Sequence, residues 1–223
     1  MSARDAILNR IRGQMPGNDK ARAKAVAERL KDHPQGVIPN RADLPAKDKL
    51  ALFMRKAEEV QATVTQVKSP GDVPKAVSTY LRDRNLPASI RMGADKRLAA
   101  MGWDKQKALE VKPGASDGDD LAGVSHAFCA IAETGTLMLT SGPDNPTTVN
   151  FLPEHHIVVV EAGDLDGTME EAFDRLRKAS RRKGIARAVN LVTGPSRSGD
   201  VEQKIILGAH GPKSLHVIVV GKT

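Results

Sequence analysis

The chain has 223 residues, of which 40% are hydrophobic and 3% aromatic. This length and apolar content suffice for one α/β domain with a helical appendage, and they exclude a chain that is disordered throughout. Lysine and arginine exceed aspartate and glutamate by 34 to 27, a net charge of +7 that suits an acidic partner or a small anionic ligand. We do not expect nucleic-acid binding, because basic residues are spread along the chain and stacking aromatics are scarce.

Helical spacing of apolar residues predicts three helices early in the chain, over residues 2–15, 18–32 and 46–61. The first 45 residues contain too little apolar surface for a core of their own. We therefore expect a helical arm over residues 1–45, packed on the main domain or on a partner, and a main α/β domain over residues 46–223.

From about residue 62 onward, short apolar runs alternate with helical patterns. The expected strands are 63–67, 88–92, 108–111, 137–140, 157–161, 188–192 and 215–220. The expected helices are 71–84, 94–101, 119–130 and 167–183, with one more between Gly199 and Gly208. Near-continuous apolar strands such as HIVVVE indicate burial on both faces. The alternation predicts an α/β fold with a mostly parallel central sheet flanked by helices.

The first segment that suggests chemistry follows the apolar run AVNLVT. Gly194, Ser196, Arg197 and Ser198 form a turn before the last expected helix. Free N–H groups at such a turn and the Arg197 fork would suit a carboxylate or a phosphate. Asp200 would lie in the first helical turn, where the helix dipole favours an acid. In the alternative interpretation, glycine and serine only cap the helix and Arg197 pairs with Asp200.

Two more turns carry candidate residues. His210 precedes Gly211, whose lack of a Cβ permits a sharp bend, so the imidazole could face a cleft and carry protons. The alternative is a buried histidine that donates to a backbone carbonyl.

The segment Glu133-Thr134-Gly135-Thr136 leads into another apolar strand. Its threonine hydroxyls surround a glycine and form a cluster of donors. Glu133 could act as a base or nucleophile in a poorly hydrated pocket. The alternative is a tight turn in which Glu133 bonds to the threonines. For an anion site, this turn and the one at Gly194 have to meet at one rim.

We expect no metal site, no cofactor bound by a familiar signature and no membrane span. His155 and His156 are adjacent in a strand and face opposite sides, and His126 with Cys129 is only half a zinc site. The single cysteine excludes an intrachain disulfide and a four-cysteine iron–sulfur cluster. The charged N-terminal stretch lacks a signal-peptide core, and no apolar run reaches the ~20 residues of a membrane helix. We expect a cytoplasmic protein.

The ordered segments AIAETGTLML, FLPEHHIVVV and TGPSRSGDVEQKIILGAHGPKSLHVIVVG resemble the LutC/YkgG-type lactate-utilisation proteins, which contain the LUD domain. The resemblance covers roughly residues 45–223. It departs at Ser198 and Gly199, where many members have threonine and alanine, and the loop at 141–150 lacks an arginine pair found in many relatives.

This resemblance implies a fold like that of the ribose-5-phosphate isomerase, glucosamine-6-phosphate deaminase and CoA-transferase group, with ligands bound beyond the carboxyl ends of the strands. It implies a role in the oxidation of L-lactate to pyruvate beside two partner proteins that carry iron–sulfur clusters. This chain would be the cluster-free accessory subunit, binding a small anionic ligand.

The alternative is a stand-alone enzyme of the isomerase or CoA-transferase type, acting on a phosphorylated or acyl substrate. Glu133 would then be the base or nucleophile and His210 would assist proton movement. That interpretation requires both side chains to face one space that a ligand atom can occupy. A basic, nucleic-acid-associated regulator is a distant third hypothesis.

Overall fold

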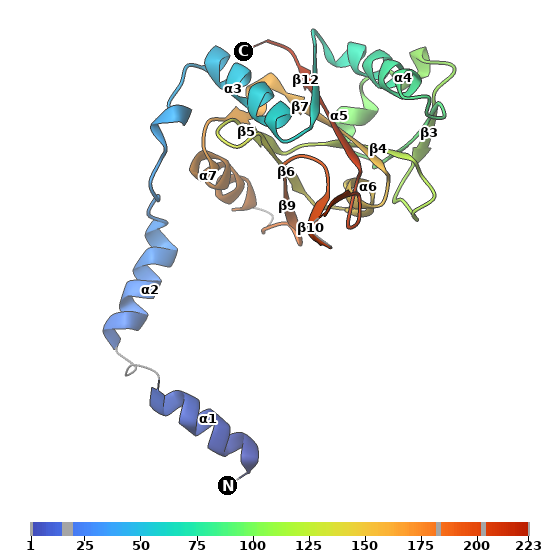
Figure 1. Ribbon diagram of the computed structural model, residues 1–223. Coiled ribbons are helices and arrows are strands. Elements are labelled where there is room, and N and C mark those ends of the chain that lie inside the picture. The colour runs from blue at the N-terminus through green and yellow to red at the C-terminus, as the bar shows by residue number, and fades with distance from the viewer. Residues whose placement is uncertain (1, 15–19, 182–183, 202–203, 223) are drawn as a thin grey trace. The chain divides into compact units, whose positions relative to one another are not determined.

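The computed structural model describes residues 2–14, 20–181, 184–201 and 204–222 (Figure 1). The chain divides into two units, residues 1–37 and 38–223. In the first unit, α1 (Ala3–Gln14) and α2 (Lys20–Asp32) bury no side chain. Residues 15, 18–19 and 182–183, at the ends of three predicted helices, and residues 202–203 within a fourth lie outside the described residues. The predicted division at residue 45 stays a prediction.

The centre of the second unit is a six-stranded sheet in the order β1-β12-β7-β4-β2-β3. Every pair of neighbours in it is parallel, which confirms the predicted α/β fold. Its strands are β1 (Thr63–Val67), β2 (Ser89–Met92), β3 (Glu110–Pro113), β4 (Ala122–His126), β7 (His155–Glu161) and β12 (Ser214–Val220).

Both faces of this sheet are buried, as the apolar runs predict. On one face, Val158 and Val217 pack in a cluster with Phe53 of α3 (Ala46–Glu59). On the other, Ile157 and Ile218 pack in a second cluster that includes α4 (Val73–Asp83) and α5 (Lys96–Ala99). Short 3₁₀ turns complete the unit at Asn40–Ala42, Pro70–Asp72, Trp103–Lys105 and Ala162–Asp164.

A second, four-stranded sheet has the order β8-β5-β6-β9. Its strands are β8 (Leu165–Asp166), β5 (Cys129–Ile131), β6 (Thr136–Thr140) and β9 (Val189–Val192), and β6 is antiparallel to both β5 and β9. Helix α7 (Met169–Ser180) covers it through Ala172 and Leu176. The short helix α6 (Thr148–Phe151) precedes β7.

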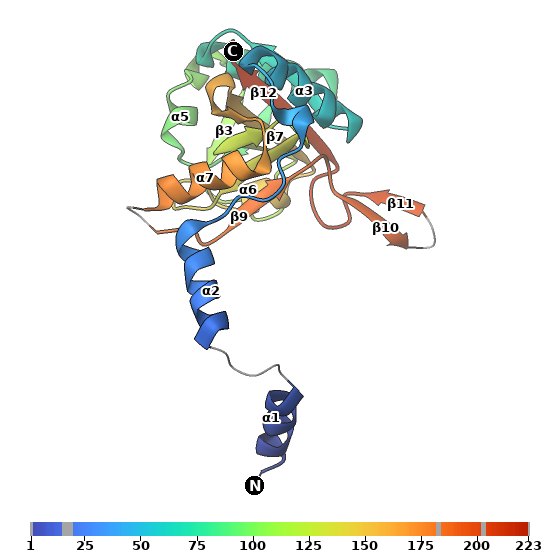
Figure 2. The ribbon, with the colours of Figure 1, turned by 90° about the vertical axis from the view of Figure 1, so that its left-hand side faces the viewer.

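Two sequence-based helix predictions are wrong. Residues 119–130 form β4 and the start of β5, because small residues in a short, fully buried run give no periodicity that separates a strand from a helix. The segment after Pro195 forms an antiparallel hairpin of β10 (Arg197–Val201) and β11 (Lys204–Leu207). Figure 2 shows this hairpin projecting from the folded unit. Within the described residues, no helix is long and apolar enough to cross a membrane.

Helix α3 approaches two glycines of the second sheet unusually closely. Gly135 and Gly194 have positive φ angles of 67° and 73°. A Cβ on Gly135 would lie 2.5 Å from the backbone nitrogen of Ala57, and a Cβ on Gly194 would overlap the carbonyl oxygen of Val60. Both positions therefore need glycine for backbone conformation and for space.

We predict that Gly194→Ala lowers the free energy of unfolding by about 2 kcal/mol or more, because it combines a strained φ with overlap against a helix backbone. Chemical denaturation measures the loss. Gly142→Ala is the matched control, since its built Cβ meets nothing within 4 Å. Equal stability of the two variants would contradict the packing described for α3.

Candidate functional site

The two turns that the sequence singles out lie side by side. Strand β6 pairs with β9, so the Thr136 turn is next to the turn that follows Val192. The hydroxyls form a chain in which Thr136 Oγ1 lies 2.7 Å from Thr134 Oγ1 and 2.7 Å from Thr193 Oγ1. The predicted meeting of these turns is therefore present in the fold.

A pocket of about 180 Å³ lies beside the second turn. It includes four of the predicted site residues, Gly194, Ser196, His210 and Gly211. The other lining residues are Asn150, Phe151, His156, Leu191, Val192, Thr193, Pro195, Pro212 and Leu215. We call this the rim pocket. It combines an apolar wall with hydroxyl, amide and imidazole groups, a composition typical of small-molecule sites.

The rim pocket does not lie where the strand-end rule predicts. His156 and Leu215 are at the amino ends of β7 and β12, not at their carboxyl ends. The reason is that the turn at Gly194 follows β9, which belongs to the second sheet and runs antiparallel to its neighbour. The rule that ligands bind beyond the carboxyl ends of strands holds for open parallel sheets, and so it does not apply to a turn that follows an antiparallel strand.

A buried polar network supports one wall of the rim pocket. The Ser125 hydroxyl donates to Asn150 Oδ1 at 2.5 Å, so His156 Nε2, 3.1 Å from Ser125 Oγ, is the donor of the second bond. Burial lowers the pKa of His156 to about 3. The imidazole is therefore neutral at physiological pH.

Ser125, Asn150 and His156 are not among the predicted site residues. A signal for two of them is present in the sequence, because Ser125 and His156 are polar residues within runs of buried strand residues. Buried polar groups require partners, so such positions mark a network. The identity of the partner, 31 residues away for this pair, depends on the fold.

Ser196 connects the two loops of the rim pocket through all its polar groups. Its N–H donates to the Pro212 carbonyl at 2.9 Å, and its carbonyl accepts from the Gly208 N–H at 3.0 Å. Its hydroxyl accepts from the His210 N–H at 3.4 Å. The Gly135 N–H is likewise bonded to the Ile131 carbonyl. These two amides are therefore not free for an anion.

Glu133 and Arg197 do not line the rim pocket. Glu133 is buried, and its Oε1 accepts from the N–H of Met169, the first residue of α7, at 2.8 Å. Arg197 donates to the carbonyl of Val60, which ends α3. Each side chain thus satisfies a helix terminus. The rim pocket therefore does not bring together Glu133 and His210, which the enzyme interpretation requires to face one space.

The remaining predicted residues lie in or near the hairpin. Ser198 is in β10 opposite Ile206, while the side chain of Asp200, and so its predicted pairing with Arg197, lies outside the described residues. Gly208, with φ of 78°, adopts the left-handed conformation in this loop. Gly211 has no positive φ, and a Cβ built on it would lie 3.4 Å from the Cβ of Ser196.

The single cysteine of the chain is unreactive as a nucleophile at neutral pH. Burial raises the pKa of Cys129 to about 12, so it stays protonated. His126 Nδ1 donates to the Ala127 carbonyl at 2.8 Å. Among the residues that the structure describes, no three histidine, cysteine or carboxylate side chains gather as a metal site.

We predict that the free energy of unfolding decreases as the pH is lowered below 6.5, the ordinary pKa of His156. Below that pH the His156 imidazole binds a proton in the unfolded chain, whereas in the folded chain it stays neutral down to about pH 3. The slope is at most about 1.4 kcal/mol per pH unit per histidine. His156→Gln should reduce the slope measured by urea unfolding between pH 4 and 7. An unchanged slope would mean that His156 is not buried as a neutral group.

Comparisons with known proteins place this geometry in a family. The model of the LUD domain matches residues 50–220. Lactate utilization protein C from Shouchella clausii is 27% identical over 233 aligned positions, covering 98% of each chain. An uncharacterized protein from Neisseria meningitidis is 33% identical over 99 residues, and this match spans 44% of the chain and only 42% of that relative.

A solved structure shows the same fold. The crystal structure of a DUF162 family protein from Deinococcus radiodurans matches with a TM-score of 0.59 and 22% identity, covering 80% of this chain and 99% of that one. The family model spans most of the α/β unit, including β1, the rim pocket and β12. The chain therefore belongs to the LUD domain family.

Proposed function

We propose that this chain is an accessory subunit for lactate utilisation, which binds a small anionic ligand in the rim pocket and acts beside iron–sulfur partner proteins. Its support is the similarity to relatives named lactate utilization protein C, one of them over 98% of both chains. The proposed subunit holds no cluster itself, in keeping with one buried cysteine. The proposed setting is the cytoplasm.

The observation that carries the ligand proposal is the composition of the rim pocket. About 180 Å³ suits a molecule of lactate or pyruvate size better than a CoA ester. Thr193 and Ser196 offer hydroxyls, and Asn150 and His210 offer further polar groups to a carboxylate. Leu215 and Phe151 provide apolar contact for a methyl group.

The stand-alone enzyme remains the second hypothesis, with a narrower basis. It needs a base beside the ligand, and Glu133 is engaged at the start of α7. Of the two residues proposed for proton movement, only His210 lines the rim pocket. The proposal of an accessory subunit needs no proton transfer by this chain.

We predict that lactate or pyruvate raises the melting temperature of the protein in a thermal-shift assay, by an amount that grows with ligand concentration. A ligand at a hundred times its Kd stabilises the folded state by about 2.7 kcal/mol. Thr193→Val and His210→Ala should abolish the shift, because each removes a polar group of the pocket. Glu133→Gln and Ser198→Ala, outside the pocket, should keep it. No shift with either acid would contradict the ligand assignment.

We predict that deletion of the gene abolishes growth on L-lactate as carbon source while growth on pyruvate continues. The wild-type gene should restore growth, and the His210→Ala variant should restore it poorly. The restored protein should co-purify with proteins that carry iron–sulfur clusters. Normal growth of the deletion strain, in the absence of a second copy, would overturn the lactate role.

A further inference from the structure

Strand β1 (Thr63–Val67) is an exposed edge of the parallel sheet. Among the strands that the structure describes, it pairs only with β12, and Thr63, Thr65 and Gln66 are exposed. In Figure 1 it runs between α3 and α4. Its sequence, TVTQV, has no proline and no charge, and the register with β12 is unbroken. A proline, a charged side chain or a bulge usually protects the edge strand of a sheet against pairing with other chains, and β1 has none of the three.

The backbone register shows which groups are available on this edge. The Val67 carbonyl accepts from the Gly221 N–H at 2.9 Å, so Val67 directs its backbone groups toward the β12 side. Backbone direction alternates along a strand. Thr63 and Thr65 therefore also face β12, while Val64 and Gln66 direct N–H and C=O to the open side.

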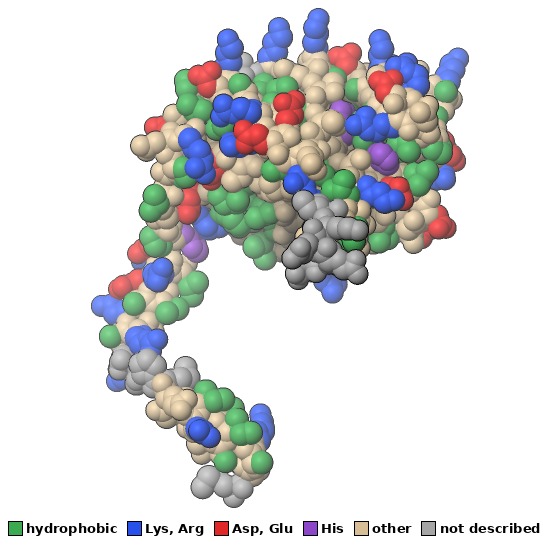
Figure 3. Space-filling view, viewed as in Figure 1, with side chains coloured by type: hydrophobic (Ala, Val, Ile, Leu, Met, Phe, Trp, Pro, Cys, Tyr) green, Lys and Arg blue, Asp and Glu red, His purple; other side chains and the backbone are tan. Residues whose placement is uncertain are grey.

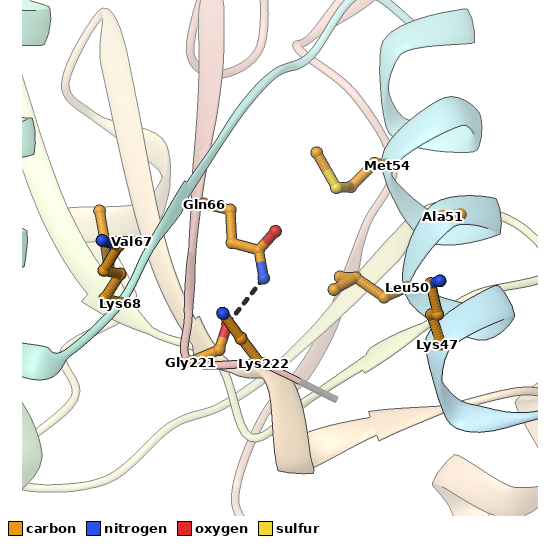
Figure 4. A pocket seen from close by; sticks show the side chains of 9 residues that line it. All are labelled: Lys47, Leu50, Ala51, Met54, Gln66, Val67, Lys68, Gly221 and Lys222. Carbon is orange, nitrogen blue, oxygen red and sulfur yellow. Dashed lines mark hydrogen bonds between the residues drawn. The ribbon is translucent and has the colours of Figure 1, made fainter.

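Two pockets flank the edge, one on each face of the sheet. The first, of about 520 Å³, lies between α3 and the carboxyl ends of β1 and β12. Figure 4 shows Leu50 and Met54 of α3 directed toward Gln66, whose amide donates to the Gly221 carbonyl at 2.7 Å. The second, of about 400 Å³, lies between β1 and α4, and Val67 lines both. A strand added to β1 would place alternate side chains in the two pockets.

The surroundings of the edge are basic. The first pocket has Lys47, Lys68 and Lys222 on its rim and no acid, and the second has Lys75 and Arg84. Figure 3 shows Lys and Arg side chains along the upper margin of this face. Within the described part of the chain, no carboxylate pairs with the lysines at 47, 68 and 75.

The acids of the second pocket already have partners. Asp72 accepts hydrogen bonds from the N–H and hydroxyl of Ser69, and Asp83 pairs with Arg82. Asp72 keeps its negative charge, because its partner is neutral, so the excess of positive charge beside β1 lies at the first pocket, whose lining has three lysines and no acid. An incoming acidic segment gains attraction there, whereas a second copy of the chain would bring two basic edges together.

We propose that β1 accepts an extended, acidic segment of a partner protein as an additional strand of the sheet. Backbone hydrogen bonds to Val64 and Gln66 hold the segment, its side chains enter the two flanking pockets, and its carboxylates face the lysines. This surface is separate from the rim pocket, and the inference does not depend on the lactate role.

The test uses a fluorescent peptide in which valine alternates with glutamate, titrated with the full chain and followed by anisotropy. We expect saturable binding that weakens with salt, and much weaker binding of the matching valine–lysine peptide. Gln66→Pro should weaken binding roughly tenfold, because it removes an outward N–H and places a ring on the edge. Gln66→Thr is the matched control: it also loses the side-chain bond to Gly221 but keeps the backbone N–H.

The double variant Lys47→Glu/Lys68→Glu gives a second test, which does not depend on how the strand tolerates proline. It should prefer the valine–lysine peptide to the valine–glutamate peptide. Three results would overturn the proposal. The first is equal binding of the acidic peptide to the folded wild type and the folded Gln66→Pro variant. The others are equal affinity of the wild type for the two peptides, and no binding of the acidic peptide. A wild-type dimer, seen in sedimentation, that Gln66→Pro dissociates would also overturn it, because the edge would then serve a second copy.

Discussion

The close contact between the end of helix α3 and the glycines at 135 and 194 is the constraint on which the second sheet and its turns depend. Backbone meets backbone there, so no side chain can mediate or adjust the spacing. The helix also leaves its terminal carbonyl at Val60 to be satisfied by Arg197. The turns that the sequence marks as an anion site thus secure α3, and two of their amides, those of Gly135 and Ser196, are already bonded within the protein.

The rim pocket contains no lysine, arginine or carboxylate among its lining residues. The net charge of +7 can attract an anion to the protein, but selection within the pocket rests on hydrogen bonds and shape. Ser125, Asn150 and His156 are fixed by one another in the wall. The network fixes the position of this wall, so a ligand has to fit its shape and the polar groups that line it.

The strongest periodic patterns predicted the fold well. Strands β7 and β12 and helices α4 and α7 lie within a few residues of their expected bounds, since their burial follows local sequence. The hairpin after Pro195 was missed because a few apolar residues fit both a helical and a strand period.

The candidate site was predicted only in part. Turn chemistry indicated Ser196 and His210, but the roles of Glu133 and Arg197 depend on helices distant in sequence.

The two surfaces described here are joined by one strand. Leu215, at the amino end of β12, lines the rim pocket, and Gly221, just past its carboxyl end, lines the pocket beside β1. Seven residues of parallel strand separate these ends by about 20 Å. Because β12 is paired on both sides and buried on both faces, it holds the surfaces at a constant spacing. A small ligand and a partner strand can therefore occupy the protein together without steric conflict, and any coupling between them has to pass through a shift of β12 itself.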